Sequence, residues 1–132
     1  MRDANRTRIP AETSIAEGIG DASAAEHGGD VLSAELLGGQ LGEQATLVQF
    51  STAFCQPCRA TRRILDEVVG MVPGTTHIEI DAESHLDLVR QLDIRRTPTT
   101  LILDRDGVIS KRASGLPRKA DVIAALGEVI GG

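Results

Sequence analysis

The spacing of hydrophobic residues predicts a buried strand that leads directly into a helix. A short apolar run over residues 46–50 ends at Ser51, and a run of this length before turn residues is typical of a strand buried on both faces. Over residues 56–70 the hydrophobic positions recur every three to four residues, while the arginines fall mostly on the opposite side. This spacing predicts an amphipathic helix that packs one side against the strand.

The second half of the chain predicts two further helices and three further strands. The alternating residues 77–81 and the apolar run 99–103 both indicate strands. Between them, Ser84 is expected to begin a short helix, with Asp87 as its capping-box partner. The tight turn 104–107 predicts a hairpin that returns over 108–113, and Pro117 is expected to open the last helix.

The predicted element order is β-α-β-α-β-β-α, which indicates an α/β fold. Because connections that contain a helix usually join parallel strands, we expect the first three strands to be parallel and the hairpin strand to be antiparallel. The result is a mixed four-stranded sheet with helices on both faces. Residues 31–41 could add a short fifth strand at the edge and a helical turn interrupted by Gly38 and Gly39.

Composition divides the chain into an acidic tail and one domain. Residues 1–30 lack hydrophobic periodicity, so we expect a disordered tail followed by a domain over 31–132. The net charge is −5, and it lies in residues 1–43, because residues 44–132 hold eleven basic and eleven acidic side chains. This balance argues against nucleic acid as a main partner. No apolar stretch has the length of a membrane span or a secretory signal, so we expect a cytoplasmic protein with no membrane partner.

Cys55 and Cys58 are the only two cysteines among 132 residues, and they lie where the first buried strand ends and the helix begins. Backbone N–H groups at a helix N-terminus carry partial positive charge and stabilise a thiolate there. Pro57 suits an early helical position, which needs no N–H donor. Open α/β sheets also place their chemistry at the carboxyl ends of their strands. The pair is therefore predicted to be a reactive dithiol.

Two other uses of the cysteine pair are less favoured. A structural disulfide would close a very short loop, which removes little entropy from the unfolded chain, and a reducing cytosol opposes it. A zinc site would need four converging ligands, but there is no second cysteine pair, and His77 and His85 lie on different predicted elements. We therefore expect no metal at this site.

Two segments of the chain resemble the thioredoxin family. Residues 47–59, LVQFSTAFCQPCR, resemble the strand and active-site turn of that family, and residues 94–99, IRRTPT, resemble its cis-proline loop, with Gly115 near an expected glycine. The resemblance covers about residues 45–130 and implies a thioredoxin fold. It further implies that Cys55 is the nucleophile and that Cys58 resolves the mixed disulfide.

The resemblance also assigns roles to the residues around the pair. Phe54, Gln56 and Pro57 would form the active-site loop. Pro98 would have a cis peptide bond and, with Thr97 and Arg96, would bind the substrate strand.

Several residues depart from the family pattern. Gln49 stands where a buried aspartate usually assists the second cysteine, and a glutamine could at best position a water. His77 stands where a buried basic partner is expected; it could transfer protons, although the simpler interpretation is a histidine at the strand edge that faces solvent or a carbonyl group. Phe54 and Ser51 replace expected aromatic residues, Phe54 in place of a tryptophan, so the rim that contacts partners is less aromatic.

Arg59, Arg95 and Arg96 are expected near Cys55. They could form a cationic rim that stabilises the thiolate and favours acidic partner surfaces. Alternatively, Arg95 and Arg96 are solvated loop residues with little effect. Arg59 is thus a candidate for tuning the dithiol, as are Gln49 and His77.

The expected function is reduction of protein disulfides by dithiol exchange, with the Cys55–Cys58 disulfide as the redox centre and no bound cofactor. The resemblance implies a flavin- and NADPH-dependent thioredoxin reductase as electron donor. Glutaredoxin-like chemistry fits less well, because Gln-Pro between the cysteines is closer to the Gly-Pro of thioredoxins. The alternative is a thioredoxin-fold redox-sensing or binding module with little catalytic turnover.

Overall fold

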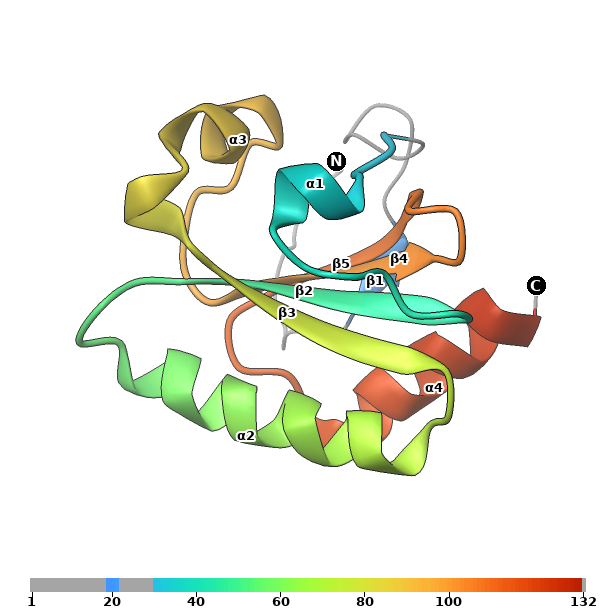
Figure 1. The fold of residues 1–132 in the computed structure, drawn as a ribbon. Helices are drawn as coiled ribbons and strands as arrows, with labels where there is room; N and C mark the ends of the chain where they lie inside the picture. The colour runs from blue at the N-terminus through green and yellow to red at the C-terminus, as the bar shows by residue number, and fades with distance from the viewer. Residues whose placement is uncertain (1–18, 22–29, 132) are drawn as a thin grey trace, which may run out of the picture.

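The computed structural model describes residues 19–21 and 30–131, and it has a central sheet with helices on both sides (Figure 1). The strands are β1 (Gly20–Asp21), β2 (Ala45–Ser51), β3 (Thr75–Asp81), β4 (Thr99–Asp104) and β5 (Ile109–Ser114). The helices are α1 (Ala34–Leu37), α2 (Gln56–Met71), α3 (Leu86–Gln91) and α4 (Lys119–Gly131), with a 3-10 turn at Ala82–Ser84. The predicted α/β architecture is confirmed.

The strands lie in the order β1-β5-β4-β2-β3, so β2 has a neighbour on each side. All seven residues of β2 are buried, which confirms the prediction of a strand covered on both faces. Hydrogen bonds hold both edges of β2, and side chains pack on both of its faces. The carboxyl end of β2 is therefore held rigidly in the molecule.

The prediction that the first three helix-linked strands are all parallel is wrong for β4. β2 and β3 are parallel, but β4 runs antiparallel to β2, with Phe50 opposite Thr99 and Ala45 opposite Asp104. The reason is the length of α3. A helix of six residues rises only about 9 Å, whereas the seven-residue β2 is roughly 23 Å long. A helix of this length does not carry the chain back to the opposite end of the sheet, and β4 enters from the end at which β3 leaves.

The sheet gains its fifth strand from the segment predicted to be a tail. Gly20 and Asp21 form β1, which pairs with β5 in antiparallel register. The described structure differs from the prediction at these two residues, and residues 1–18 and 22–29 lie outside the described range. Within 31–41 the predicted helical turn is confirmed by α1, whereas the predicted short edge strand is reduced to an isolated bridge between Val31 and Val108.

The two faces of the sheet are covered by different helices. α2 and α4 lie on one face, where Leu47 of β2 packs among Leu65 and Leu126 (Figure 1). On the other face, α1 and α3 cover a cluster around Phe50 that includes Leu88. Alternate residues of β2 thus face α2, and this alternation decides which polar side chains lie under the dithiol.

The start of α3 differs from the prediction. Ser84 does not begin the helix, because it belongs to a 3-10 turn whose N-cap is Asp81. The Asp81 carboxylate accepts hydrogen bonds from the backbone N–H of Glu83 at 3.0 Å and from the Ser84 hydroxyl at 2.9 Å, so that hydroxyl is already engaged. α3 begins at Leu86 without a side-chain cap. Within the described residues, the helices fall short of the length and apolar content that crossing a membrane requires.

Candidate active site

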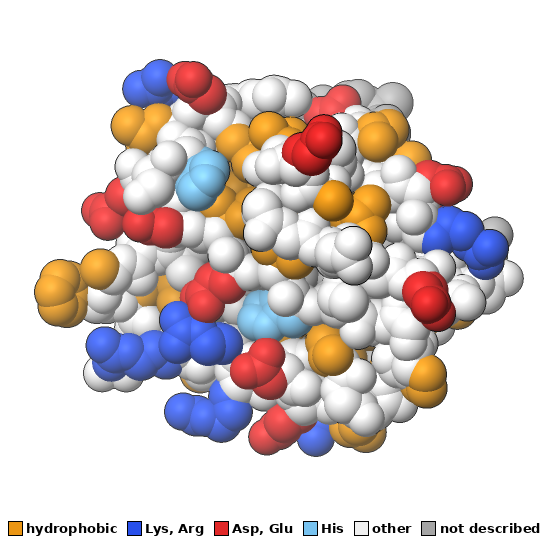
Figure 2. Space-filling model, viewed as in Figure 1, with side chains coloured by type: hydrophobic (Ala, Val, Ile, Leu, Met, Phe, Trp, Pro, Cys, Tyr) orange, Lys and Arg blue, Asp and Glu red, His pale blue; other side chains and the backbone are white. Residues whose placement is uncertain are grey.

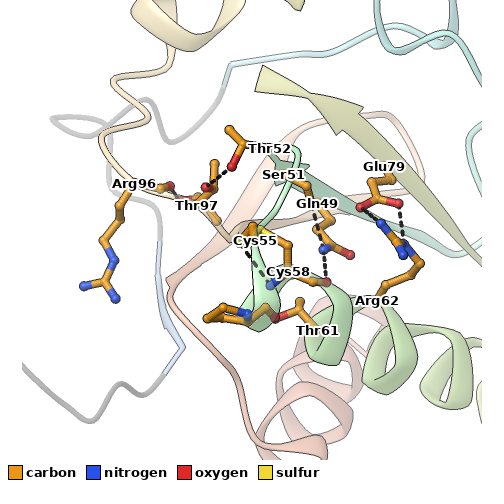
Figure 3. The surroundings of a disulfide bond; sticks show 12 residues. Gln49, Ser51, Thr52, Cys55, Cys58, Thr61, Arg62, Glu79, Arg96 and Thr97 are labelled. Atoms are coloured by element: carbon orange, nitrogen blue, oxygen red, sulfur yellow. Dashed lines mark hydrogen bonds and ion pairs between the residues drawn. A yellow bond between two sulfur atoms is a disulfide. The ribbon is translucent and has the colours of Figure 1, made fainter. Parts of the chain in front are cut away.

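The cysteine pair lies at the carboxyl end of β2, where α2 begins (Figure 3). Cys55 is the N-cap residue of α2, and its Sγ accepts a hydrogen bond from the backbone N–H of Cys58 at 3.2 Å. Pro57 lies in the first turn, where its missing N–H leaves no intrahelical bond unmade. The predicted placement is confirmed, and the helix directs an N–H group at the outer sulfur.

The two cysteines form a disulfide, with 5.2 Å between their Cα atoms. Cys55 is partly exposed, whereas Cys58 is only 1% exposed. A disulfide of another protein could therefore reach Cys55 but not Cys58. After reduction, Cys58 could react only with Sγ of Cys55, once that sulfur is bonded to a sulfur of another protein.

The loop before α2 carries an almost fully exposed aromatic side chain. Phe54 is 95% exposed, and its φ of 61° is a left-handed conformation that is uncommon for a bulky residue. Gln56 and Pro57 are exposed as well. All three side chains are therefore accessible to a partner that approaches Cys55.

The cis-proline loop adjoins this turn. The Thr97–Pro98 peptide bond is cis, as the sequence led us to expect. The Thr97 hydroxyl lies 3.3 Å from that of Thr52, which follows β2 (Figure 3). The carbonyl of Pro98 accepts a hydrogen bond from the backbone N–H of Gly115 at 2.8 Å. The loop is thus fixed both to the active-site turn and to the chain that leaves β5.

Positive charge near the turn comes mainly from α2. Arg95 pairs with Asp93 at 2.8 Å, and Arg96 points away from the disulfide (Figure 3). Arg95 and Arg96 are both exposed, which agrees with the alternative that they are solvated loop residues and not part of a rim around the disulfide. In Figure 2, Lys and Arg side chains gather over the start of α2. The exposed arginines there are Arg59, Arg62 and Arg63.

A buried amide lies directly beneath the dithiol. Gln49 of β2 is fully buried, and its Nε2 donates to the carbonyl oxygen of Cys58 and to Oγ of Ser51, each at 2.8 Å. Its Oε1 lies 3.0 Å from Nε2 of His77. The amide therefore has a partner for each of its polar atoms and binds the backbone of the inner cysteine directly, with no water between them.

His77 lies inside this arrangement rather than at a solvated edge. Its side chain is 9% exposed, and its Nδ1 lies 2.9 Å from Oδ1 of Asp66, a residue of α2 whose side chain is 63% exposed. Of the two surroundings that the simpler interpretation of His77 allowed, solvent and a carbonyl group, the ring has the second, because its Nε2 faces the carbonyl oxygen of the Gln49 side chain; the carboxylate of Asp66 was not expected. β3 is parallel to β2 and its alternate side chains face α2, which brings His77 between Gln49 and Asp66.

A second charged pair joins the same helix and strand. Arg62 of α2 donates to both carboxylate oxygens of Glu79 on β3, at 2.7 and 2.8 Å. The hydrogen bond from Arg62 lowers the pKa of Glu79, against an opposing effect of burial, and a hydrogen bond from Ser51 lowers it further. The same pairing raises the pKa of Arg62. The Ser51 hydroxyl thereby connects the Gln49 amide to the Glu79 carboxylate.

The turn is bordered by a depression of about 360 Å³ next to the carboxyl ends of β2 and β3. It is lined by Ser51, Thr52, Ala53, Arg62, Glu79 and Asp81. Ser51 is too small to fill this space, as an aromatic side chain at that position could. Within residues 19–21 and 30–131, no group of three or more His, Cys, Asp or Glu side chains is arranged to hold a metal ion.

Comparison with known proteins assigns the family. The family model described as Thioredoxin matches residues 35–128. The chain belongs to the thioredoxin family. Thioredoxin from Chlamydia trachomatis is 28% identical over 93 residues, which cover 70% of this chain and 90% of that protein. Thioredoxin H5 of Oryza sativa subsp. japonica is also 28% identical, over 54% of this chain and 53% of its own length.

Solved structures agree with this assignment. A crystal structure of chloroplastic thioredoxin z superposes with a TM-score of 0.61 at 26% identity, covering 68% of this chain and 81% of that one. The thioredoxin fold implied by the sequence is thus confirmed. The pair Cys55 and Cys58, closed as a disulfide, is that of a thiol–disulfide oxidoreductase of this family.

Asp66, Arg62 and Glu79 were not among the site residues predicted from the sequence of this thioredoxin-family chain. A usable signal was present, because Arg62 and Asp66 are four residues apart on a helix and therefore share one face. His77 and Glu79 are two apart on a strand and also share a face. Opposite charges at these two spacings indicate that the helix crosses the strand with both pairs in contact.

Proposed function

We propose that this protein reduces disulfide bonds in other proteins by dithiol exchange through Cys55 and Cys58. One observation carries the proposal. The partly exposed sulfur of Cys55 accepts a helix N-terminal N–H group and is bonded to a cysteine that is almost fully buried. A two-step exchange requires an accessible nucleophilic sulfur and a second sulfur that other proteins cannot reach.

The exchange begins with reduced protein. The Cys55 thiolate attacks one sulfur of the client disulfide, the client S–S bond breaks, and the departing client sulfur leaves as a thiolate that takes up a proton. The Cys58 thiol then loses its proton and attacks Sγ of Cys55, which releases the second client sulfur as a thiol after protonation. Two electrons have passed to the client, and the Cys55–Cys58 disulfide of the structure is the product.

The next cycle requires two electrons from a donor. We infer from the family that a flavin- and NADPH-dependent thioredoxin reductase supplies them, and that the protein works in the cytoplasm as part of electron transport that maintains cellular redox balance. Arg59 and Arg63, the exposed arginines of α2 that are not paired with Glu79, favour acidic surfaces on the proteins that dock beside Cys55.

The client chain would lie along the cis-proline loop. Thr97 and Pro98 adjoin the active-site turn, and an extended client segment could pair with the backbone there, as strands do at an exposed edge. Phe54 would contact the client on the other side of Cys55, and Arg96 would contact it farther from the sulfurs.

Insulin reduction with dithiothreitol tests the proposal. We expect the wild-type protein to accelerate precipitation of the insulin B chain, and the Cys55→Ser variant to give only the rate of dithiothreitol alone. The Cys58→Ser variant should retain the first step and accumulate a mixed disulfide with the client, visible on a non-reducing gel.

A redox-sensing or binding module is the second candidate function. The observation that favours it is Gln49, which does not titrate and so cannot accept the proton of Cys58. Equal insulin reduction by the wild-type and Cys55→Ser proteins would support this candidate and contradict the proposed reductase activity.

A further inference from the structure

We propose that His77 is a positioning residue for the second step of the exchange, in which Cys58 attacks Cys55. Its ring is held between Asp66 and Gln49, where it acts as a cation that fixes the Gln49 amide against the Cys58 backbone. This inference rests on the proposed disulfide exchange, because it concerns the reactivity of the inner cysteine.

The carbonyl group of Cys58 determines how the Gln49 amide is oriented. A carbonyl oxygen can only accept a hydrogen bond, so the NH₂ group of Gln49 must face it, at 2.8 Å. The same NH₂ group has one more hydrogen, which it donates to Ser51 Oγ. The oxygen of the amide is therefore left to face Nε2 of His77, at 3.0 Å.

The two neighbours of His77 then determine the protons on its ring. Gln49 Oε1 is an acceptor, so Nε2 of His77 must donate to it. The ionised carboxylate of Asp66 is also acceptor-only, so Nδ1 must donate to it, at 2.9 Å. Only the imidazolium ring donates from both nitrogens. A neutral ring would leave one of these two contacts without a hydrogen.

The charges that face His77 are consistent with a cationic ring. α2 contributes Arg62 and Asp66, and β3 contributes His77 and Glu79, which form two pairs side by side. With a protonated ring the four side chains sum to zero charge. With a neutral ring the group would carry one net negative charge next to a cysteine that must become an anion.

The position of His77 affects the reactivity of Cys58 but not that of Cys55. Cys58 is almost fully buried, so solvent stabilises its thiolate poorly. The Gln49 amide joins the imidazolium to the backbone of that residue. Cys55 instead lies at the surface and is stabilised by the N-terminus of α2. Loss of the His77 charge should therefore slow the second step and leave the first step unchanged.

Single-turnover kinetics separate the two steps. Reduced protein is mixed with a peptide disulfide, the reaction is quenched with acid, and mass spectrometry follows formation and decay of the mixed disulfide. For His77→Gln, which keeps a donor but removes the charge, we expect decay to slow by about tenfold, in line with the strength of a charge-assisted hydrogen bond. Formation of the mixed disulfide should stay within about twofold.

Three other variants complete the experiment. His77→Lys restores a cation that can donate to Gln49, and it should recover most of the wild-type decay rate. Asp66→Asn removes the exposed partner of the ring and should slow decay by a few-fold. Glu128→Gln is the matched control, because it removes an ion pair with Lys111 that lies on another helix, and it should change neither step.

Each outcome supports or overturns the inference. Wild-type decay in His77→Gln, or an equal loss in both steps, would overturn it, as would a His77→Lys variant as slow as His77→Gln. If His77→Gln does not fold, Asp66→Asn decides by the same comparison, since its side chain is exposed. A wild-type protein that forms no mixed disulfide at all would contradict the proposed function itself, which is a distinguishable result.

Discussion

Replacing Thr100 by valine should make the protein more stable. Thr100 is 1% exposed and lies in β4 opposite Gln49, and its hydroxyl has no hydrogen-bond partner among the described residues. A buried hydroxyl without a partner has lost its hydrogen bonds to water and gained none in return. Valine has the same branched shape and the same preference for strands, so the substitution changes little except this hydroxyl.

The expected gain follows from two contributions. A buried polar group without a partner costs about 1–3 kcal/mol, and the added methyl group contributes roughly 0.8 kcal/mol of hydrophobic burial. Because neighbouring side chains must adjust to the methyl group, we expect a net increase of about 1–2 kcal/mol in the free energy of unfolding. Urea denaturation of the oxidised protein should then show the midpoint raised by about 0.5–1 M.

Thr46→Val provides the matched control. Thr46 is equally buried, but its hydroxyl accepts a hydrogen bond from the backbone N–H of Gly42 at 2.8 Å. The valine there would leave that N–H group without a partner, which costs about 1–3 kcal/mol. The two substitutions are chemically identical, so they should have opposite signs. Destabilisation by both, or stabilisation by both, would refute the argument from hydrogen bonding.

Two further predictions concern the active-site surface. Phe54→Ala should lower kcat/KM for a protein disulfide by several-fold while the free energy of unfolding stays within about 0.5 kcal/mol, because the ring is exposed; an unchanged kcat/KM would exclude the ring from client binding. Glu79→Gln should destabilise the protein at neutral pH by about 0.5–1 kcal/mol. Because Arg62 lowers the pKa of Glu79 below its ordinary value of 4.5, this contribution is complete above that pH. The contribution is lost as the pH falls through the lowered pKa that Glu79 has in the folded protein. The stability difference between the two proteins should therefore vanish in acid. A difference that does not depend on pH would contradict the assignment.

The sequence predicted what depends on local spacing. The strand that becomes β2, the helix after the cysteines and the hairpin at residues 104–107 each follow from a hydrophobic period or a turn motif. The direction of β4 does not, because it depends on whether a connecting helix is long enough to cross the sheet, and α3 has only six residues. Edge strand β1 has two residues and pairs across a long sequence separation, so no local period marks it.

Several residues of the site could be predicted from the sequence, but their contacts across different elements could not. Cys55, Cys58 and Pro98 are marked by their residue types and by their position next to a strand. His77 was singled out and a carbonyl partner was allowed for it, but its contact with Asp66 was not predicted, since that contact depends on how α2 crosses β3. A sequence gives the face of each element on which a side chain lies, but not which opposing side chain it meets.

The three departures from the family pattern at positions 49, 51 and 77 belong together. The Gln49 amide has three polar requirements at this place: its two hydrogens need acceptors, one of which is the Cys58 carbonyl, and its oxygen needs a donor. Ser51 supplies the second acceptor and His77 supplies the donor. An aromatic residue at position 51 would leave one amide hydrogen unpaired in the protein interior, at a cost of about 1–3 kcal/mol. A glutamine beneath the dithiol is therefore best satisfied with a small hydroxyl residue and an N–H donor beside it, so replacing any one of Gln49, Ser51 and His77 by the usual residue of the family should destabilise the protein more than replacing all three together.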